Sequence, residues 1–193
     1  MESRNFFLPG IVIMIITIII TLLTAMGITR EKEAGTIEQL AVSPIAGWEL
    51  VLGKTIPFLF IGVVDLSIAT TVIYIIFNVT MNGNIFVYYT LNIVYIIAML
   101  GIGLFISTVS QSQGQAMMTV FAALFPGIIL SDFFFPIENM PQGIQWLTLI
   151  NPIKYAMHSQ REIFIKGNGF EAISESLLVL GLFALFFYAY GAI

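Results

Sequence analysis

The sequence predicts an all-α polytopic membrane protein with five transmembrane spans. Of its 193 residues, 59% are hydrophobic and only 9% are charged, whereas soluble domains contain about 25% charged residues. The mean hydropathy of +0.99 agrees with residence in a bilayer. Because a hydrocarbon core of ~30 Å takes about 20 helical residues to cross, the chain holds about five spans with short connections and forms a single membrane domain over 1–193.

Composition also excludes several kinds of chemistry. The chain has no cysteine and one histidine, which excludes disulfides, thiolate sites and a histidine-rich metal cluster. Its net charge of −4 argues against a nucleic-acid partner, because phosphates need a basic surface. No nucleophile, base and orienting group stand in a catalytic pattern, so we expect neither a catalytic residue nor a metal ligand.

Five apolar stretches are the expected spans, and they are placed at about 6–28, 56–77, 85–109, 116–130 and 176–193. The first is longer than the core of a signal peptide and is not followed by an A-x-A cleavage site. Pro57 is expected in the first turn of the second span, where proline is tolerated.

The connection 29–55 is polar and carries most of the early charges. Thr36 and Gln39 fit a capping box that opens a short amphipathic helix, and Gly35 permits a sharp turn before it. This helix is either a solvated loop or a docking surface for a soluble partner. The sequence Gly53-Lys54-Thr55 ends like a phosphate-binding loop, but five residues separate Gly53 from Gly47 where the motif needs four. We therefore expect no nucleotide site here.

The stretch 131–171 mixes aromatic residues, prolines and scattered charges. It predicts two short amphipathic helices at about 141–150 and 152–165, with Asn151 as the N-cap of the second and Pro152 in its first turn. Neither is long enough to cross, so they are expected to enter the membrane surface or lie along it.

Asp65 stands inside the second span, where an ionisable group should face protein or a wet path. It is either an ion or proton site or a buried hydrogen-bonding group. The second interpretation is favoured because no other acid or base lies within a span. His158, beside other charges, is expected at the surface.

Two motifs resemble the ABC-2 type export permeases, in the drug-efflux branch of that family. The first is Thr29-Arg-Glu-Lys-Glu-Ala-Gly-Thr-Ile-Glu-Gln-Leu-Ala-Val-Ser-Pro-Ile45, followed by Trp48-Glu-Leu-Val-Leu-Gly-Lys54. The second is Phe135-Pro-Ile-Glu-Asn-Met-Pro141, followed by Trp146 and Asn151-Pro152. They occur in the order and between the spans that the family shows, so the resemblance covers essentially the whole chain.

The resemblance implies that 29–55 is cytosolic and that a separate ATPase subunit, which binds ATP and Mg, contacts it. The implied coupling residues are Arg30, Glu31, Glu33, Gly35, Thr36, Glu38 and Gln39. The stretch 131–171 would form an external re-entrant hairpin, with the motif residues Phe135, Pro136, Glu138, Pro141, Trp146, Asn151 and Pro152. The N-terminus would lie outside and the C-terminus inside the cell membrane. Lysine and arginine counts at the two sides are too even to decide this orientation.

The resemblance further implies a permease subunit without a cofactor of its own and without enzymatic activity. It would export substrate by alternating access beside a second permease copy or a related half. The family places another span before the first one here, so we expect this chain to be the C-terminal portion of a longer permease. The alternatives are an ion-coupled secondary transporter or channel that uses Asp65, and a non-transporting anchor or assembly subunit. Secondary transporters often contain inverted repeats, and the sequence shows none.

Overall fold

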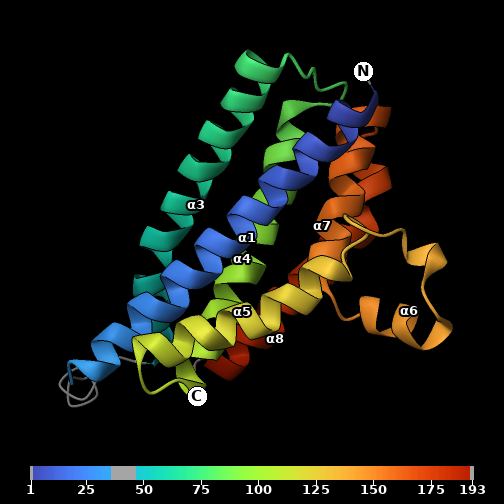
Figure 1. The fold of residues 1–193 in the computed structure, drawn as a ribbon. Coiled ribbons are helices and arrows are strands. Elements are labelled where there is room, and N and C mark those ends of the chain that lie inside the picture. Colours follow the sequence, from blue (N-terminus) through green and yellow to red (C-terminus); the bar gives the residue numbers. More distant parts are fainter. Residues whose placement is uncertain (1, 36–46, 192–193) are drawn as a thin grey trace.

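The computed structural model describes residues 2–35 and 47–191, and within these ranges the regular structure is entirely helical. This confirms the predicted all-α class. The elements along the chain are α1 (Glu2–Glu33), α3 (Gly47–Phe77), α4 (Ile85–Val109), α5 (Gln113–Ile129), the 3₁₀ turn η1 (Ile137–Asn139), α6 (Gln142–Thr148), α7 (Pro152–Arg161), the π-helical turn η2 (Glu162–Lys166) and α8 (Phe170–Gly191) (Figure 1).

Four of the described helices, α1, α3, α4 and α8, are long and apolar enough to cross a membrane. The fifth apolar helix, α5, has 17 residues. At 1.5 Å per residue it extends about 25 Å, which is less than the ~30 Å of hydrocarbon. Four spans are therefore supported directly, where the sequence predicts five.

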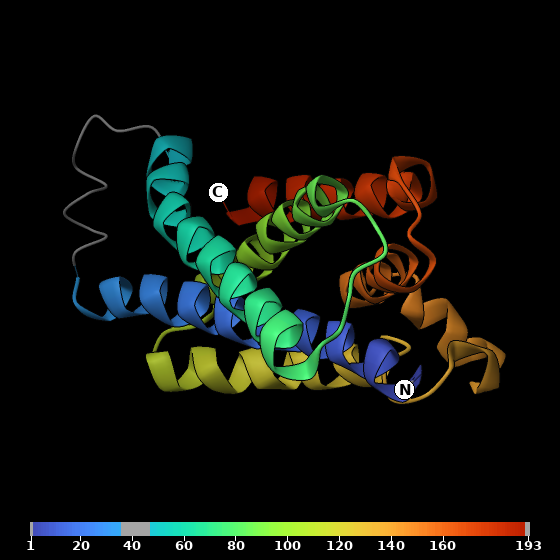
Figure 2. The same cartoon turned by 90° about the horizontal axis from the view of Figure 1, so that it is seen from above.

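Helices α1, α4 and α8 run in one direction and α3 runs in the opposite direction (Figure 1). The N-terminus and the connection 78–84 lie at one end of the bundle. The last turn of α1, the turn 110–112 and the C-terminus lie at the other end (Figure 1). Both α5 and α7 pack against α1, so the chain returns along α1 towards the N-terminal end while α6 stands to the side (Figures 1 and 2).

Helix α4 is the centre of the bundle. In its most apolar stretch 61% of the residues are buried, against 17% for α3 at the periphery. It packs mainly against α1 and α8, and its Tyr88 and Tyr95 are fully buried. Gly103 allows the close approach to α1, because a Cβ atom there would stand 2.7 Å from the Cβ of Thr24 and 3.0 Å from the backbone oxygen of Thr21.

Buried hydroxyl groups of α1 face this contact. Thr17 donates to the backbone oxygen of Ile13 at 2.5 Å and also bonds the hydroxyl of Tyr95 on α4. Thr24 donates to the backbone oxygen of Ile20 at 2.8 Å. Each of these two hydroxyls therefore has an acceptor within its own helix, which a polar group inside a bilayer requires.

The helix bounds differ from the predicted spans mainly where polar residues continue a helix. Helix α1 runs on through its charged last turn to Glu33, and α3 begins at Gly47, well before the expected span. Pro57 consequently lies inside α3 and not in its first turn, so that expectation was wrong. A proline ring crowds the carbonyl of the residue four positions earlier, which here is Gly53.

The shorter elements also differ from the sequence-based ranges. Helix α5 starts at Gln113 because Ser112 is its N-cap and accepts from the backbone N–H of Gln115 at 3.2 Å. Helix α6 ends at Thr148, and α7 passes into a π-helical turn after Arg161. Helix α8 begins at Phe170, six residues before the expected start, since the polar residues there form its first turns.

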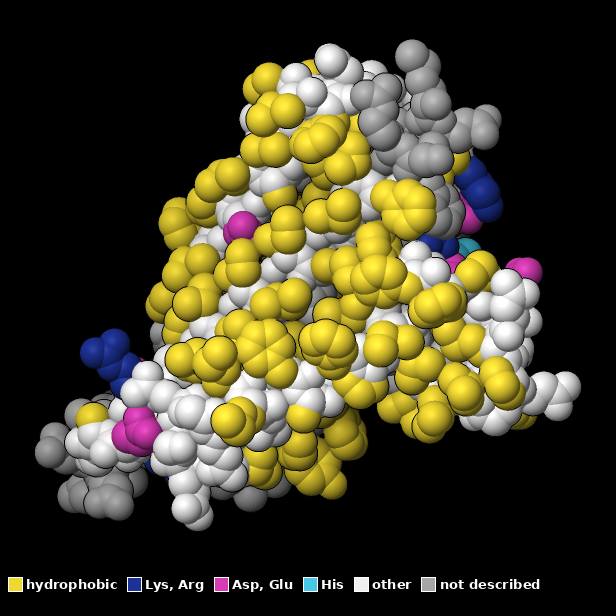
Figure 3. Space-filling view, viewed as in Figure 1, with side chains coloured by type: hydrophobic (Ala, Val, Ile, Leu, Met, Phe, Trp, Pro, Cys, Tyr) yellow, Lys and Arg dark blue, Asp and Glu magenta, His cyan; other side chains and the backbone are white. Residues whose placement is uncertain are grey.

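The surface agrees with a membrane environment. Figure 3 shows hydrophobic side chains over the broad face formed by α3, α1 and α5, while most charged side chains visible on that face lie towards the ends. Isoleucine and phenylalanine residues of α3 such as Phe60, Ile68 and Ile75 are more than half exposed. In water such a face would be unstable, whereas hydrocarbon tails solvate it.

Candidate functional site

The last turn of α1 is joined to the turn between α4 and α5. The ammonium group of Lys32 donates to the backbone oxygens of Thr108 and Ser110, each at 3.0 Å. These oxygens lie at the C-terminal end of α4, where carbonyl groups lack partners within the helix and the helix dipole is negative. Lys32 therefore caps α4 from a neighbouring helix.

The next residue, Glu33, has the complementary role at the start of α5. Its carboxylate accepts from the backbone N–H of Gln113 at 3.0 Å and from the side-chain amide of the same residue at 2.7 Å. Free N–H groups and a positive dipole mark the N-terminus of a helix. Two adjacent side chains of α1 thus hold the end of one helix and the beginning of the next.

A third contact at this end of the molecule joins α1 to α3. Glu31 forms an ion pair with Lys54, whose side chain is 15% exposed. Arg30 is exposed. Gly35 has φ of +69° and its N–H donates to the oxygen of Lys32 at 3.1 Å, so the expected turn is present.

The remaining predicted coupling residues, Thr36, Glu38 and Gln39, lie outside the described residues, as does the amphipathic helix expected there. Four of the seven predicted coupling residues can therefore be placed, and Glu31 and Glu33 make the interhelical contacts. We name the group of Glu31, Lys32, Glu33, Lys54 and Gln113 the α1 clamp.

Asn151 organises the segment before the last helix. Its side-chain oxygen accepts from the backbone N–H of Ile153 at 3.1 Å, as the predicted N-cap should, and Pro152 follows in the first turn. Its amide nitrogen donates to the backbone oxygen of Gly127 at 2.6 Å. That oxygen lies in the last turn of α5, where carbonyls need outside partners, so Asn151 ties α5 to α7.

We expect Asn151→Ala to lower the free energy of unfolding by about 1–2 kcal/mol, because it removes both the cap and the bond to Gly127. Asn151→Ser keeps a neutral N-cap acceptor for the start of α7 and loses the bond to Gly127, so its loss should be smaller. Unfolding in mixed detergent micelles measures both variants. Equal losses would show that the cap contributes nothing.

The other predicted residues of this segment lie at its surface. Those exposed to the surroundings are Phe135, Pro136, Glu138, Pro141 and Trp146. Pro141 directly precedes α6, and the indole of Trp146 is 72% exposed. Exposed tryptophan is typical of the boundary between membrane and water.

An ion pair that the sequence did not suggest holds this segment against α7. The guanidinium of Arg161 bonds the carboxylate of Asp132 and, at 2.5 Å, its backbone oxygen. Asp132 also accepts from the backbone N–H of Ile137 at 3.1 Å, and its φ is +67°. The two charges are separated by 29 residues, and no local spacing signals such a pair.

Glu162 shows a second unforeseen contact at the end of α7. It is buried, and its carboxylate accepts from Lys166 at 2.5 Å and from Asn168 at 2.6 Å. The hydrogen bond from Lys166 holds the pKa of Glu162 below its ordinary value, against the opposing effect of burial. The carboxylate of Glu162, at the start of the π-helical turn, thereby contacts residues at the end of that turn. His158 on the same helix is exposed.

Asp65 lies on α3, and its Oδ2 atom is buried without a hydrogen-bond partner among the described residues. The described part of the chain contains no group of three or more histidine, cysteine, aspartate or glutamate side chains that could hold a metal ion. Within the apolar stretch Val51–Phe77 of α3, Asp65 is the only acidic residue.

The apolar helices and the polar ends together define a multi-pass helical membrane protein. Residues 1–165 match the family model described as ABC-2 type transporter. The match spans most of the sequence and includes both motifs that resemble this family. The chain belongs to the ABC-2 type transporter family.

Several curated proteins are similar to the chain. The probable multidrug ABC transporter permease YbhR of Escherichia coli K12 is 33% identical over 177 residues, which cover 92% of this chain and 48% of that protein. The probable multidrug ABC transporter permease YbhS of the same organism is 35% identical, over 86% of this chain and 44% of that protein. The inner membrane transport permease YhhJ of Escherichia coli K12 is 30% identical, over 86% of this chain and 44% of that protein. The chain thus spans about half the length of these relatives.

Proposed function

We propose that the chain forms part of the membrane subunit of an ABC exporter, which moves substrate out of the cytoplasm by alternating access. ATP and Mg would be bound by a separate ATPase subunit, and a second permease copy or a related half would complete the pathway. Membership of the ABC-2 family supports this role, as do relatives named as probable multidrug permeases.

The α1 clamp is the observation that carries the proposal. The predicted coupling segment 29–55 begins on α1, where consecutive side chains contact α3, the end of α4 and the start of α5. A displacement of this segment would therefore be passed to all three helices at once.

We further propose a topology with the α1 clamp in the cytosol, the N-terminus outside and the C-terminus inside. Helix α5 would enter from the cytosolic side, and α6 and α7 would form the external re-entrant hairpin 131–171. The re-entrant α7 would occupy the outer leaflet beyond the end of α5, since both helices pack against α1. This arrangement would compensate for the shortness of α5.

Glu38→Lys in the complete permease tests the coupling role. Glu38 lies in the segment between α1 and α3, and the change reverses a charge that the ATPase would contact. We expect substrate-stimulated ATPase activity to fall about tenfold while the permease still inserts and folds. Glu171→Lys, the same change in the exposed first turn of α8, is the matched control. Unchanged stimulation and unchanged assembly with the ATPase in the Glu38 variant would refute the docking role.

The unpartnered Oδ2 of Asp65 is the one observation that favours an ion-coupled transporter or channel. Asp65→Asn separates the alternatives in the same transport assay. An ABC exporter should retain ATP-dependent transport in this variant, whereas an ion-coupled transporter would lose its ion-dependent transport. A non-transporting anchor subunit would show no transport with either residue.

A further inference from the structure

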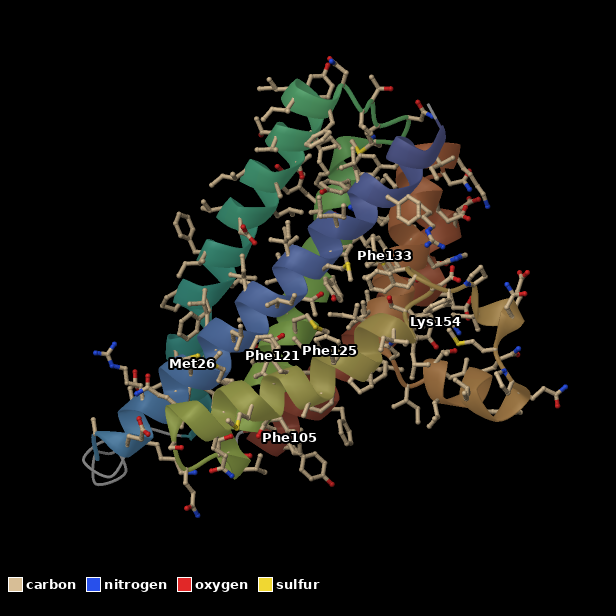
Figure 4. The ribbon with its side chains drawn as sticks, in the orientation of Figure 1. Met26, Phe105, Phe121, Phe125, Phe133 and Lys154 are labelled. Atoms are coloured by element: carbon tan, nitrogen blue, oxygen red, sulfur yellow. The ribbon has the colours of Figure 1, made fainter. Side chains whose placement is uncertain are left out.

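A cavity of about 650 Å³ opens between the segment that follows α5, helix α7 and the first turns of α8. It lies away from the α1 clamp, towards the N-terminal end, and Figure 4 labels Phe133 and Lys154 from its lining. Its charged lining consists of Asp132, Glu138, Lys154, His158, Arg161 and Glu175. The proposed transport function does not account for this concentration of charge.

Helix α7 supplies the basic wall of the cavity. Lys154, His158 and Arg161 recur at the spacing that places them along one helical face. Arg161 is paired with Asp132. Lys154 forms no ion pair with any residue that the structure describes; it donates to the hydroxyl of Thr148 at 3.1 Å, and its nitrogen lies 5.7 Å from the centre of the Tyr155 ring. Its charge is therefore available to an anion.

Two acids from other elements form the acidic part of the lining, here called the acidic wall. Glu138 comes from η1 and Glu175 from α8. Neither carboxylate forms an ion pair within the described ranges 2–35 and 47–191. Glu175 shares the lining of the cavity with Lys154, Tyr155 and His158 of α7. A cavity lined by groups of both signs suits a ligand that carries both charges.

Aromatic rings form the remaining side of the cavity. Phe7 stands edge-on to Phe133 at 5.7 Å between ring centres, and Phe133 stands edge-on to Phe134 at 4.9 Å. Phe7 and Phe134 are 45% and 55% exposed. Phe7 belongs to the spanning helix α1, so this edge leads from the charged walls to the apolar surface of the bundle. Such a junction of charge and apolar surface is found at the level of lipid headgroups.

We propose that this cavity binds the headgroup of a membrane phospholipid that carries both a phosphate and a primary ammonium group. The phosphate would meet Lys154 and His158, and the ammonium would donate to Glu175 and Glu138. The acyl chains would leave across Phe7 and Phe134. Charge-assisted hydrogen bonds of this kind are about twice as strong as neutral ones, and a trimethylated ammonium could not donate them.

Native mass spectrometry of the purified chain in detergent tests the proposal by measuring the dissociation constants of added lipids. The probes are phosphatidylethanolamine, phosphatidylcholine and phosphatidylglycerol with identical acyl chains, together with soluble phosphoethanolamine. We expect phosphatidylethanolamine to bind about tenfold more tightly than either other lipid, which corresponds to about 1.4 kcal/mol. Phosphoethanolamine alone should bind far more weakly, because it lacks the acyl chains.

Variants of each wall locate the site. Lys154→Gln should weaken phosphatidylethanolamine and phosphatidylglycerol alike by about tenfold, since both carry phosphate. Glu175→Gln should weaken phosphatidylethanolamine only. Arg30→Gln and Glu171→Gln remove charges of the same two signs outside the cavity and should leave lipid binding unchanged.

Equal affinity for the three lipids would overturn the proposal, as would equal effects of the cavity variants and their controls. Binding of phosphoethanolamine as tightly as the lipid would assign the site to a soluble phosphate ester instead. Should Lys154→Gln fail to fold, the exposed Glu175 still supplies the test. These outcomes are independent of the transport role, because neither ATP nor a partner subunit takes part.

Discussion

Replacement of Asp132 by alanine is expected to lower the free energy of unfolding by about 3 kcal/mol. The change removes the partner of Arg161 and the acceptor for the N–H of Ile137. Breaking a buried ion pair costs about 3–5 kcal/mol, and this figure is reduced here because Asp132 and Arg161 are 30% and 18% exposed and Arg161 keeps its bond to the backbone oxygen of residue 132. Alanine must also adopt the left-handed φ of +67°, which costs roughly 1–2 kcal/mol.

Asp132→Asn is the informative companion. Asparagine tolerates the left-handed conformation and retains an oxygen for Ile137, so only the charge towards Arg161 is lost. We expect its loss of stability to be about half that of the alanine variant, measured by unfolding in mixed micelles. If both variants matched the parent chain, the contact between the segment after α5 and α7 would carry no stability.

A valine at position 103 should destabilise the bundle by about 3 kcal/mol, and an alanine by about 1–2 kcal/mol. Extra atoms in a well-packed core force neighbours apart. Even the first added carbon of residue 103 would stand 2.7 Å from the Cβ of Thr24 and 3.0 Å from a backbone oxygen. Neither of these atoms can turn away, so α1 and α4 must separate.

Gly114→Ala provides the matched control for Gly103→Ala. A Cβ on Gly114 meets nothing within 4 Å, and alanine is the better helix former by up to about 1 kcal/mol. Opposite signs for the two alanine variants in the same unfolding assay would confirm that the space beside α4, and not glycine in general, decides the result. Equal signs would contradict the described packing of α1 on α4.

The sequence predicts the fold class and the cap of α7 because both depend on local signals. Long apolar runs mark the membrane helices, and Asn151 before Pro152 marks the start of a helix. The family was likewise recognisable, since each of its two motifs lies in one continuous stretch. The turn at Gly35 was predictable for the same reason: a glycine stands where φ becomes positive.

The contacts between distant parts of the chain had no such signal. In the sequence, Lys32 and Glu33 are two charges of a polar connection. In the structure they cap the end of α4 and the start of α5, about 80 residues away. The end of α1 and the start of α3 lie beyond the predicted spans for a related reason. Charged residues at the end of a span continue the helix when a neighbour such as Lys54 pairs with them, and the neighbour becomes known only with the fold.

The threonines of α1 bear on how the protein is made. Thr17 meets Tyr95, a residue 78 positions later in the chain, so α1 must enter the bilayer well before its partner helix has been synthesised. During that interval a bare hydroxyl in hydrocarbon would be costly. Because Thr17 and Thr24 donate to oxygens one turn earlier in their own helix, neither of these two hydroxyls requires the partner helix α4 to be present. Insertion and assembly can therefore proceed as separate stages.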